Sequence, residues 1–287
     1  MILRMISLLL KLISAISLPT IHRLGSLLGH LMYFLIPKSK QLIIDNLKQS
    51  HFFNDRFSLN QAVKLNVLES GKFIVETFAI WQKEEAELLA MIKQVHGWSM
   101  VKDALQLGKG VIFLTPHLGC FEITSIYYGS KHPITVLYRA PKQAWLIAFM
   151  QAGRSRTGVT LAEANAGGVR KLMQALKRNE AIGILPDQIP AEGEGEWADF
   201  FGKPAYTMTL ASKLAEKTGA SVIMAYGERL ADGAGYEIHL QKIESIATPG
   251  LLNKAIEAQI AQKPTQYLWR YNRYKQRRHA VEKLDNL

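Results

Sequence analysis

Hydrophobic positions divide the chain into three parts with different periodicities. Residues 1–37 are almost continuously apolar, with charges only at Arg4, Lys11 and Arg23. From Leu42 to Val95, apolar residues recur at three- and four-residue spacings without an intervening proline, which predicts helix. After Trp98, short apolar runs rich in β-branched residues alternate with amphipathic stretches. The third part therefore predicts alternating strands and helices.

The elements of the third part define a fold class. Five strands are predicted, at Val111–Thr115, Ile134–Tyr138, Ala181–Leu185, Ser221–Tyr226 and Tyr236–Leu240. Two helices are predicted, at Gly167–Arg178 and at Thr207–Thr218 before Gly219, and residues 189–197 resemble a loop. This alternation predicts the α/β class, as a layered α/β/α domain with a mixed, largely parallel central sheet and an antiparallel late strand. We expect a hydrophobic helical segment over residues 1–40 and the main domain over residues 41–287.

The apolar N-terminus indicates contact with a membrane. It contains no run of about 20 uncharged apolar residues, which a confident spanning helix needs. Leu12–Ile21 has the length of a signal-peptide core, but its n-region and cleavage site are poor. We therefore expect an uncleaved anchor, either one tilted helix with Lys11 at the headgroups or two interfacial helices broken at Pro19. The alternative is a helix pair buried in the globular fold. Basic residues after Pro37 favour a main domain on the cytoplasmic side.

Composition narrows the function classes. The 287 residues include 35 Lys and Arg against 24 Asp and Glu, so the formal charge is +11, yet 48% of residues are hydrophobic. Disorder is excluded by this apolar content, and the single cysteine excludes a disulfide framework and a cysteine-based zinc site. The histidines lack metal-ligand spacing, so we expect no metal. Neither zinc-finger spacing nor a sequence-reading helix is present, and we expect no nucleic acid partner. The balance suits a globular domain that works on an acidic, apolar surface such as a membrane.

One constellation carries candidate chemistry. His117 follows the first predicted strand and Pro116, Gly119 permits a tight turn, and Glu122 falls in the first turn of the next helix. A carboxylate at this spacing can orient the imidazole and make it a general base. No G-x-S-x-G elbow supplies a serine nucleophile, so the histidine is expected to activate a substrate hydroxyl. By itself the pair is also compatible with a loop histidine and a surface glutamate.

Several blocks in order give the chain a family resemblance. They are His117-x4-Glu122, Leu137–Lys142, Gly183–Gln188, Phe200–Ala205 and Gln266–Lys275. With them the sequence resembles the bacterial lipid A late (secondary) acyltransferases, of lauroyl/myristoyl transferase type. These lie within the His-x4-Asp/Glu glycerolipid acyltransferase superfamily. The resemblance covers almost the whole chain, and Glu rather than Asp at position 122 is typical of the lipid A branch.

The resemblance implies an activity and a location. It implies transfer of a C12–C14 acyl chain from acyl carrier protein to a hydroxyl of a lipid A precursor, with His117 as general base oriented by Glu122. It also implies the inner membrane of a Gram-negative bacterium, with membrane lipids as contacts and no cofactor besides the carrier thioester. No acyl-enzyme is needed, so Cys120 is expected to be a small packing residue. A lysophospholipid or another glycolipid is the alternative acceptor, and a basic membrane-binding protein without activity is the non-enzyme alternative.

The same blocks suggest substrate-binding residues. Arg139 follows the second strand, where a guanidinium could grip an acceptor phosphate. Asp187 and Gln188 end the third strand, at the sheet edge that carries His117 if the sheet is parallel. Asp187 could organise the basic residues or hold the acceptor's sugar hydroxyls, and its alternative role is to cap the following turn. Arg170, after a glycine pair, and Lys203 are further candidate anion ligands. For the charged candidates, salt bridges and solvated surface are the alternatives.

Overall fold

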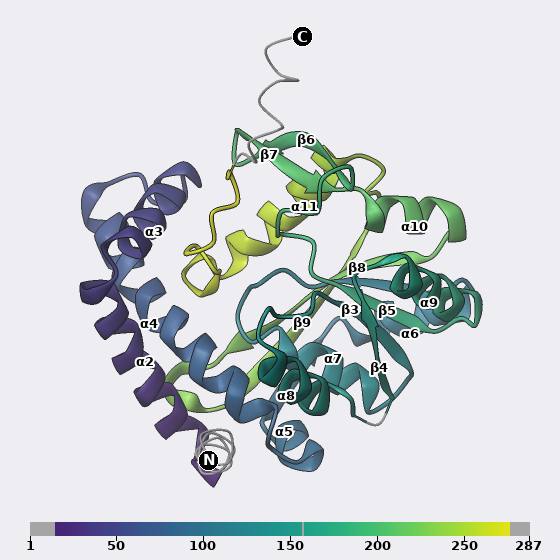
Figure 1. Ribbon diagram of the computed structural model, residues 1–287, viewed down its shortest axis with the longest axis horizontal. Helices are drawn as coiled ribbons and strands as arrows, with labels where there is room; N and C mark the ends of the chain where they lie inside the picture. Colours follow the sequence, from purple (N-terminus) through teal and green to yellow (C-terminus); the bar gives the residue numbers. More distant parts are fainter. Residues whose placement is uncertain (1–14, 157, 276–287) are drawn as a thin grey trace.

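A seven-stranded sheet forms the centre of the computed structural model, which describes residues 15–156 and 158–275 (Figure 1). Its strand order is β1-β9-β8-β2-β5-β3-β4. The strands are β1 (Ile92–His96), β2 (Val111–Leu114), β3 (Ile134–Tyr138), β4 (Val159–Glu163), β5 (Ala181–Ile184), β8 (Ser221–Arg229) and β9 (Tyr236–Ile243). Every pairing is parallel except that of β8 with β9. The expected mixed, largely parallel sheet with a late antiparallel strand is confirmed.

Helices cover both faces of the sheet. Side chains alternate along β2, so Val111 and Phe113 enter one apolar core while Ile112 and Leu114 enter the other. The first core includes residues of α5 (Glu85–Ala90), α6 (Trp98–Gln106), α7 (Glu122–Gly129) and α8 (Ala144–Arg154). The second includes residues of α3 (Pro37–Gln49), α9 (Ala166–Lys177), α10 (Leu210–Thr218) and α11 (Pro249–Gln262). The long α4 (Arg56–Ile80) contributes to both cores. The layered α/β/α architecture follows from this arrangement.

Four strands were not predicted, and each has a physical reason. β1 lies where helix was expected up to Val95, and it mixes half-buried and exposed residues without alternation at the sheet edge. β4 is likewise an edge strand with exposed positions. β6 (Gly195–Phe200) and β7 (Lys203–Met208) form a separate antiparallel hairpin of mixed polarity. The expected helix from Thr207 starts instead at Leu210, because Thr207 belongs to β7.

The helix α2 (Leu18–Leu35) packs along α4 at one side of the molecule, on the left in Figure 1. A methyl group on Gly71 of α4 would lie 2.0 Å from the carbonyl oxygen of Gly25, so the two backbones are in direct contact. The outward side of α2 carries exposed apolar residues, namely Leu24, Leu27, Leu31, Phe34 and Leu35. Within residues 15–156 and 158–275, no helix combines the length and the hydropathy needed to cross a bilayer. A spanning anchor is therefore not shown, and Arg4 and Lys11 lie outside the described residues.

Candidate active site

The loop between β2 and α7 is held from two sides. Gly119 has a positive φ of 59°, and a Cβ at this position would lie 2.0 Å from the carbonyl oxygen of Gly227 on β8. The next amide, that of Cys120, donates to the same Gly227 oxygen at 2.7 Å. From the C-terminal segment, the Leu268 amide donates to the carbonyl oxygen of His117 at 3.0 Å. His117 therefore sits on a loop whose backbone is fixed.

His117 pairs with Asp187, which follows the neighbouring strand β5. The Nδ1 atom of His117 lies 2.9 Å from Oδ1 of Asp187, and the backbone amide of His117 donates to Oδ2 at 2.9 Å. The register explains the pairing: Leu114 of β2 lies opposite Ile184 of β5, and each strand is followed three residues later by one member of the pair. The imidazole is 11% exposed and the carboxylate 2%. One edge of the ring thus faces a buried carboxylate.

The ionised Asp187 selects one tautomer of the neutral His117 ring. Burial raises the pKa of the Asp187 carboxyl, but the facing His117 and its two hydrogen bonds outweigh burial and hold this pKa below its ordinary value. An ionised carboxylate can only accept, so Nδ1 of His117 carries the ring proton and Nε2 is left with its lone pair. The Gln188 amide nitrogen lies 3.1 Å from this Nε2. His117 is thus oriented as a general base, with Gln188 at the atom that would take the proton.

Glu122 pairs with Arg154 instead of His117. Nε of Arg154 lies 3.0 Å from each carboxylate oxygen of Glu122, and Nη2 makes a second, short contact with Oε1. No hydrogen bond between Glu122 and His117 occurs in the part of the chain that the structure describes. This geometry differs from the expected His117–Glu122 pairing, because Asp187 already occupies Nδ1 and the Phe121 ring packs edge-on against the imidazole at 4.9 Å. Arg154 lies on α8 and had no signal in the sequence, since its partner is 32 residues away.

An apolar pocket of about 650 Å³, counted with its open mouth, lies beside this cluster. Phe121, whose ring packs against His117, lines it together with Thr115 and the Glu122–Arg154 pair. His117 itself lines a separate, smaller hollow with Phe73 and Tyr267. The rest of its wall comes from the sheet and from α6 and α7, including Trp98, Phe113, Tyr127, Val136, Gly183 and Leu240. The mostly apolar wall of this pocket suits an apolar ligand.

The remaining sequence candidates lie elsewhere. Arg139 is exposed directly after β3, which is parallel to β5, so it leaves the sheet at the edge that also carries Asp187. Arg170 is exposed on α9. Lys203 is exposed at the start of β7 and lies over the ring of Tyr274. The structure thus brings Asp187 and Gln188 to His117, and none of the three cations contacts His117 in the described residues.

Cys120 lies within the loop but does not offer a nucleophile. Its side chain is buried, and burial, together with the charge of Glu76, raises the pKa of its thiol well above the usual value. A thiol held in its neutral form is a poor nucleophile. This agrees with its expected role as a small packing residue.

A buried network of charged residues contacts the loop between β2 and α7. Arg229 of β8 donates to the carbonyl oxygen of Gly119 at 2.8 Å and, through Nε, to Glu76 of α4 at 2.7 Å. Glu76 also lies 3.0 Å from Nε2 of His22 on α2. These residues were not singled out from the sequence, although a lone Glu76 within the apolar run 73–80 indicates a buried partner.

The site defines a class of enzyme, and sequence comparison gives the family. His117 beside an apolar pocket suits direct transfer of an acyl group to a hydroxyl. The nearby thiol is buried, and no serine of the described residues is hydrogen-bonded to His117. The chain belongs to the bacterial lipid A biosynthesis acyltransferase family, which matches residues 3–276. It is an acyltransferase of lipid A biosynthesis.

The names of two similar proteins specify different acyl chains. The chain is 25% identical over 272 residues to a lipid A biosynthesis lauroyltransferase of Escherichia coli (strain K12), covering 92% of this chain and 88% of that protein. It is also 25% identical to the lipid A biosynthesis palmitoleoyltransferase of the same organism, covering 90% and 86%. A lipid A biosynthesis acyltransferase of Haemophilus influenzae is 24% identical over 60% of this chain and 56% of its own length.

Proposed function

We propose that this acyltransferase moves a C12–C14 acyl chain from acyl carrier protein to a hydroxyl of a lipid A precursor, with His117 as general base and Asp187 as the carboxylate that orients it. The observation that carries the proposal is the His117–Asp187 pair beside the apolar pocket. Family membership supports the acceptor class. Glu122, in this proposal, organises the wall of the pocket through Arg154.

The reaction needs one proton relay. The acceptor hydroxyl displaces the Gln188 amide from His117 Nε2 and gives its proton to that atom. Its oxygen then attacks the carbonyl carbon of the thioester, and the C–S bond breaks. The carrier thiolate leaves and takes the proton back from the imidazolium. Asp187 stabilises this transient charge, since its carboxylate already faces Nδ1 at 2.9 Å.

The acyl chain occupies the apolar pocket. Burial of each additional methylene contributes about 0.8 kcal/mol, so a pocket of fixed depth distinguishes neighbouring chain lengths about fourfold per methylene until it is full. Aromatic residues, including Trp98, Phe113 and Tyr127, form a rigid part of its wall. Phosphate groups of the acceptor are bound by the exposed cations Arg139, Arg170 and Lys203, which have no carboxylate partner in the described part of the chain.

The membrane contact is made by the outward side of α2. Leu27, Leu31 and Phe34 are exposed there, and Lys38 and Lys40 follow at the start of α3. Apolar side chains beside basic ones suit the interface of an anionic leaflet. We therefore assign residues 1–40 as a membrane-associating segment at the inner face of the inner membrane, with residues 41–287 as the acyltransferase domain in the cytoplasm. Co-sedimentation with anionic vesicles tests this membrane contact. The double variant Leu31→Glu, Phe34→Glu is expected to bind the vesicles more weakly than the unaltered protein.

One assay tests the reaction itself. Purified enzyme is incubated with the phosphorylated disaccharide precursor and a mixed pool of acyl carrier thioesters, and the products are weighed by mass spectrometry. We expect the precursor to gain the mass of one C12–C14 acyl group, and we expect no gain with the His117→Ala enzyme. A second assay offers a lysophospholipid in place of the precursor. If the enzyme acylates the lysophospholipid and not the precursor, the proposed acceptor is wrong.

A further inference from the structure

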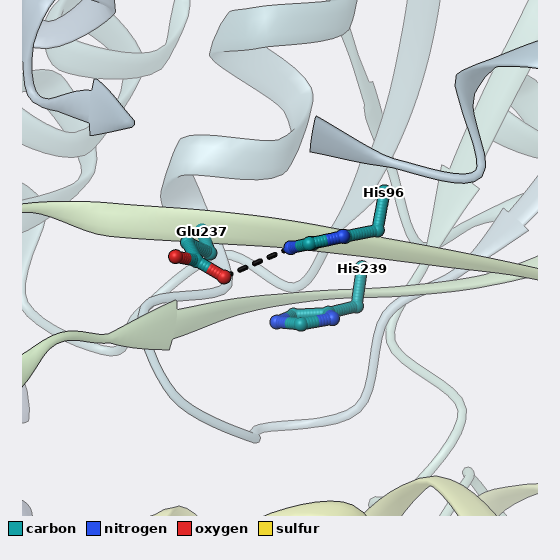
Figure 2. A group of neighbouring side chains, drawn as sticks. All are labelled: His96, Glu237 and His239. Atoms are coloured by element: carbon teal, nitrogen blue, oxygen red, sulfur yellow. Dashed lines mark hydrogen bonds and ion pairs between the residues drawn. The ribbon is translucent and has the colours of Figure 1, made fainter. Parts of the chain in front are cut away.

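Three potential ligand side chains gather near one edge of the sheet, outside the candidate active site. His96 lies on β1, and Glu237 and His239 lie on β9 (Figure 2). The His96 Nε2 atom lies 2.8 Å from Oε2 of Glu237, and the His96 ring stacks on the His239 ring with centroids 4.6 Å apart. One ligand atom from each of the three lies within 4.8 Å of the others. The parallel register brings them together, because it pairs His96 with His239 directly.

We propose that His96, His239 and Glu237 bind a first-row transition-metal dication of the Zn²⁺ type. Two imidazoles and one carboxylate form a donor set that suits zinc and its neighbours, whereas Mg²⁺ and Ca²⁺ prefer oxygen ligands alone. Around a tetrahedral ion with bonds of about 2.0–2.1 Å, neighbouring donor atoms lie about 3.3 Å apart. The separations, at most 4.8 Å, therefore need to close by about 1.5 Å at most. Small torsional changes that tilt the two stacked rings toward the ion supply this movement.

Neighbouring residues hold one of the ligands in place. Oε2 of Glu228, on β8, lies 3.0 Å from Nε2 of His239. Lys263 holds the other oxygen of Glu228 at 2.7 Å, and the Tyr226 ring stacks on His239 with centroids 4.7 Å apart. Glu228 and Tyr226 therefore orient His239, and Glu228 is not one of the three ligands. The side chains of His96 and His239 are 39% and 24% exposed, so an ion can enter from solvent.

The metal would cross-link an edge strand. Among the described strands, β1 pairs with β9 alone, and its ladder is irregular between Ile92 and Gln94. An ion bound by His96 on one strand and by Glu237 and His239 on the other would tie β1 to the sheet. Binding to the folded state raises stability in proportion to the logarithm of metal concentration above Kd. The site therefore serves stability and lies apart from the acyl-transfer chemistry of His117.

Metal titration of the full-length protein, without a histidine tag, tests this proposal. Protein in detergent micelles is stripped with a chelator and titrated with Co²⁺, whose visible d–d absorption reports coordination by nitrogen and oxygen. We expect one equivalent to bind and to be displaced by Zn²⁺, and we expect Zn²⁺ to raise Tm. Loss of one ligand in His239→Ala or Glu237→Gln is expected to weaken binding by about 10–100-fold or more.

A matched control and a second measurement keep the test decisive. His30→Ala removes an exposed histidine on α2 that is not part of the cluster, and it should bind Co²⁺ as the unaltered protein does. Equal Co²⁺ affinity of the unaltered protein and His239→Ala, or no saturable binding, would overturn the proposal. If the variants fail to fold, X-ray absorption of the Zn²⁺-loaded unaltered protein decides. Scattering from two imidazoles supports the site, and scattering without imidazole overturns it.

Discussion

Replacing Asp187 with Asn leaves the side-chain volume almost unchanged but removes the negative charge that faces Nδ1 of His117. The carboxylate accepts from both Nδ1 and the backbone amide of His117, at 2.9 Å each, in a position that is 2% exposed. Asn offers a single acceptor oxygen for these two donors. When that oxygen accepts from the backbone amide, the NH₂ group faces Nδ1 and drives the ring proton onto Nε2. His117 then holds a proton on the atom that must take one.

The size of the effect follows from general-base catalysis. This catalysis contributes about 10²–10⁴-fold, and each factor of ten corresponds to about 1.36 kcal/mol of barrier. Asp187→Asn should therefore lower kcat by about 10²–10⁴-fold, or about 3–5 kcal/mol. The KM for the acyl donor should change little, because Asp187 does not line the apolar pocket.

Initial rates with the acyl carrier thioester and the disaccharide precursor measure this change, with product quantified by mass spectrometry. Circular dichroism and Tm establish that the variant is folded. An Asp187→Asn enzyme that is folded and keeps more than about a tenth of the normal kcat would refute the orienting role, since the expected loss is about 10²-fold or larger.

Three further predictions follow from other parts of the site. Glu122→Gln should lower Tm and activity, because it leaves Arg154 without its carboxylate partner. Adding Arg154→Gln should restore part of both quantities. A double variant as inactive as Glu122→Gln alone would show that Glu122 acts on His117 directly. Gly183→Ala adds a methyl group to the pocket wall, so competition assays with mixed thioesters should shift toward chains about one methylene shorter, by about fourfold; an unchanged preference would place the chain elsewhere. Burial raises the pKa of Glu76, but Arg229 and His22 outweigh burial and lower this pKa from 4.5 to about 2. The ionised Glu76 therefore stabilises the folded state above pH 4.5, and this contribution is lost as the pH falls toward 2. Glu76→Gln should lower the unfolding free energy at neutral pH by about 3–5 kcal/mol, with a difference that shrinks below pH 4.5; urea titrations that give a constant difference would contradict this.

The parts of the fold that the sequence predicted well are those buried on both faces. β2, β3 and β5 are almost entirely apolar in sequence, because the two helical layers leave nearly all of their positions buried. β1 and β4 lie at the two edges of the sheet and mix exposed with buried positions, so their patterns resemble neither a buried strand nor a clear alternation. The hairpin of β6 and β7 lies outside the main sheet and has the same mixed character.

The sequence placed three residues of the candidate site at one sheet edge but did not predict how they pair. His117, Asp187 and Gln188 were all found from their places after predicted strands. The partner of His117 depends on which strand lies beside β2, and residues 70 apart are brought together only by the pairing of β2 with β5. The cluster of His96 and His239 depends on sheet order in the same way, since β1 pairs with a strand from the far end of the chain. Local spacing therefore favoured Glu122, which is near in sequence but pairs with Arg154 in the fold.

The tautomer of His117 tests the orientation of the catalytic base most directly. Protein labelled with ¹⁵N-histidine, in micelles and mildly alkaline buffer, gives long-range proton–nitrogen correlations that identify which ring nitrogen of His117 carries the proton. We predict a proton on Nδ1 in the unaltered protein and in Glu122→Gln, and a shift of that proton to Nε2 in Asp187→Asn. A His117 tautomer that changes in Glu122→Gln and stays unchanged in Asp187→Asn would contradict the account.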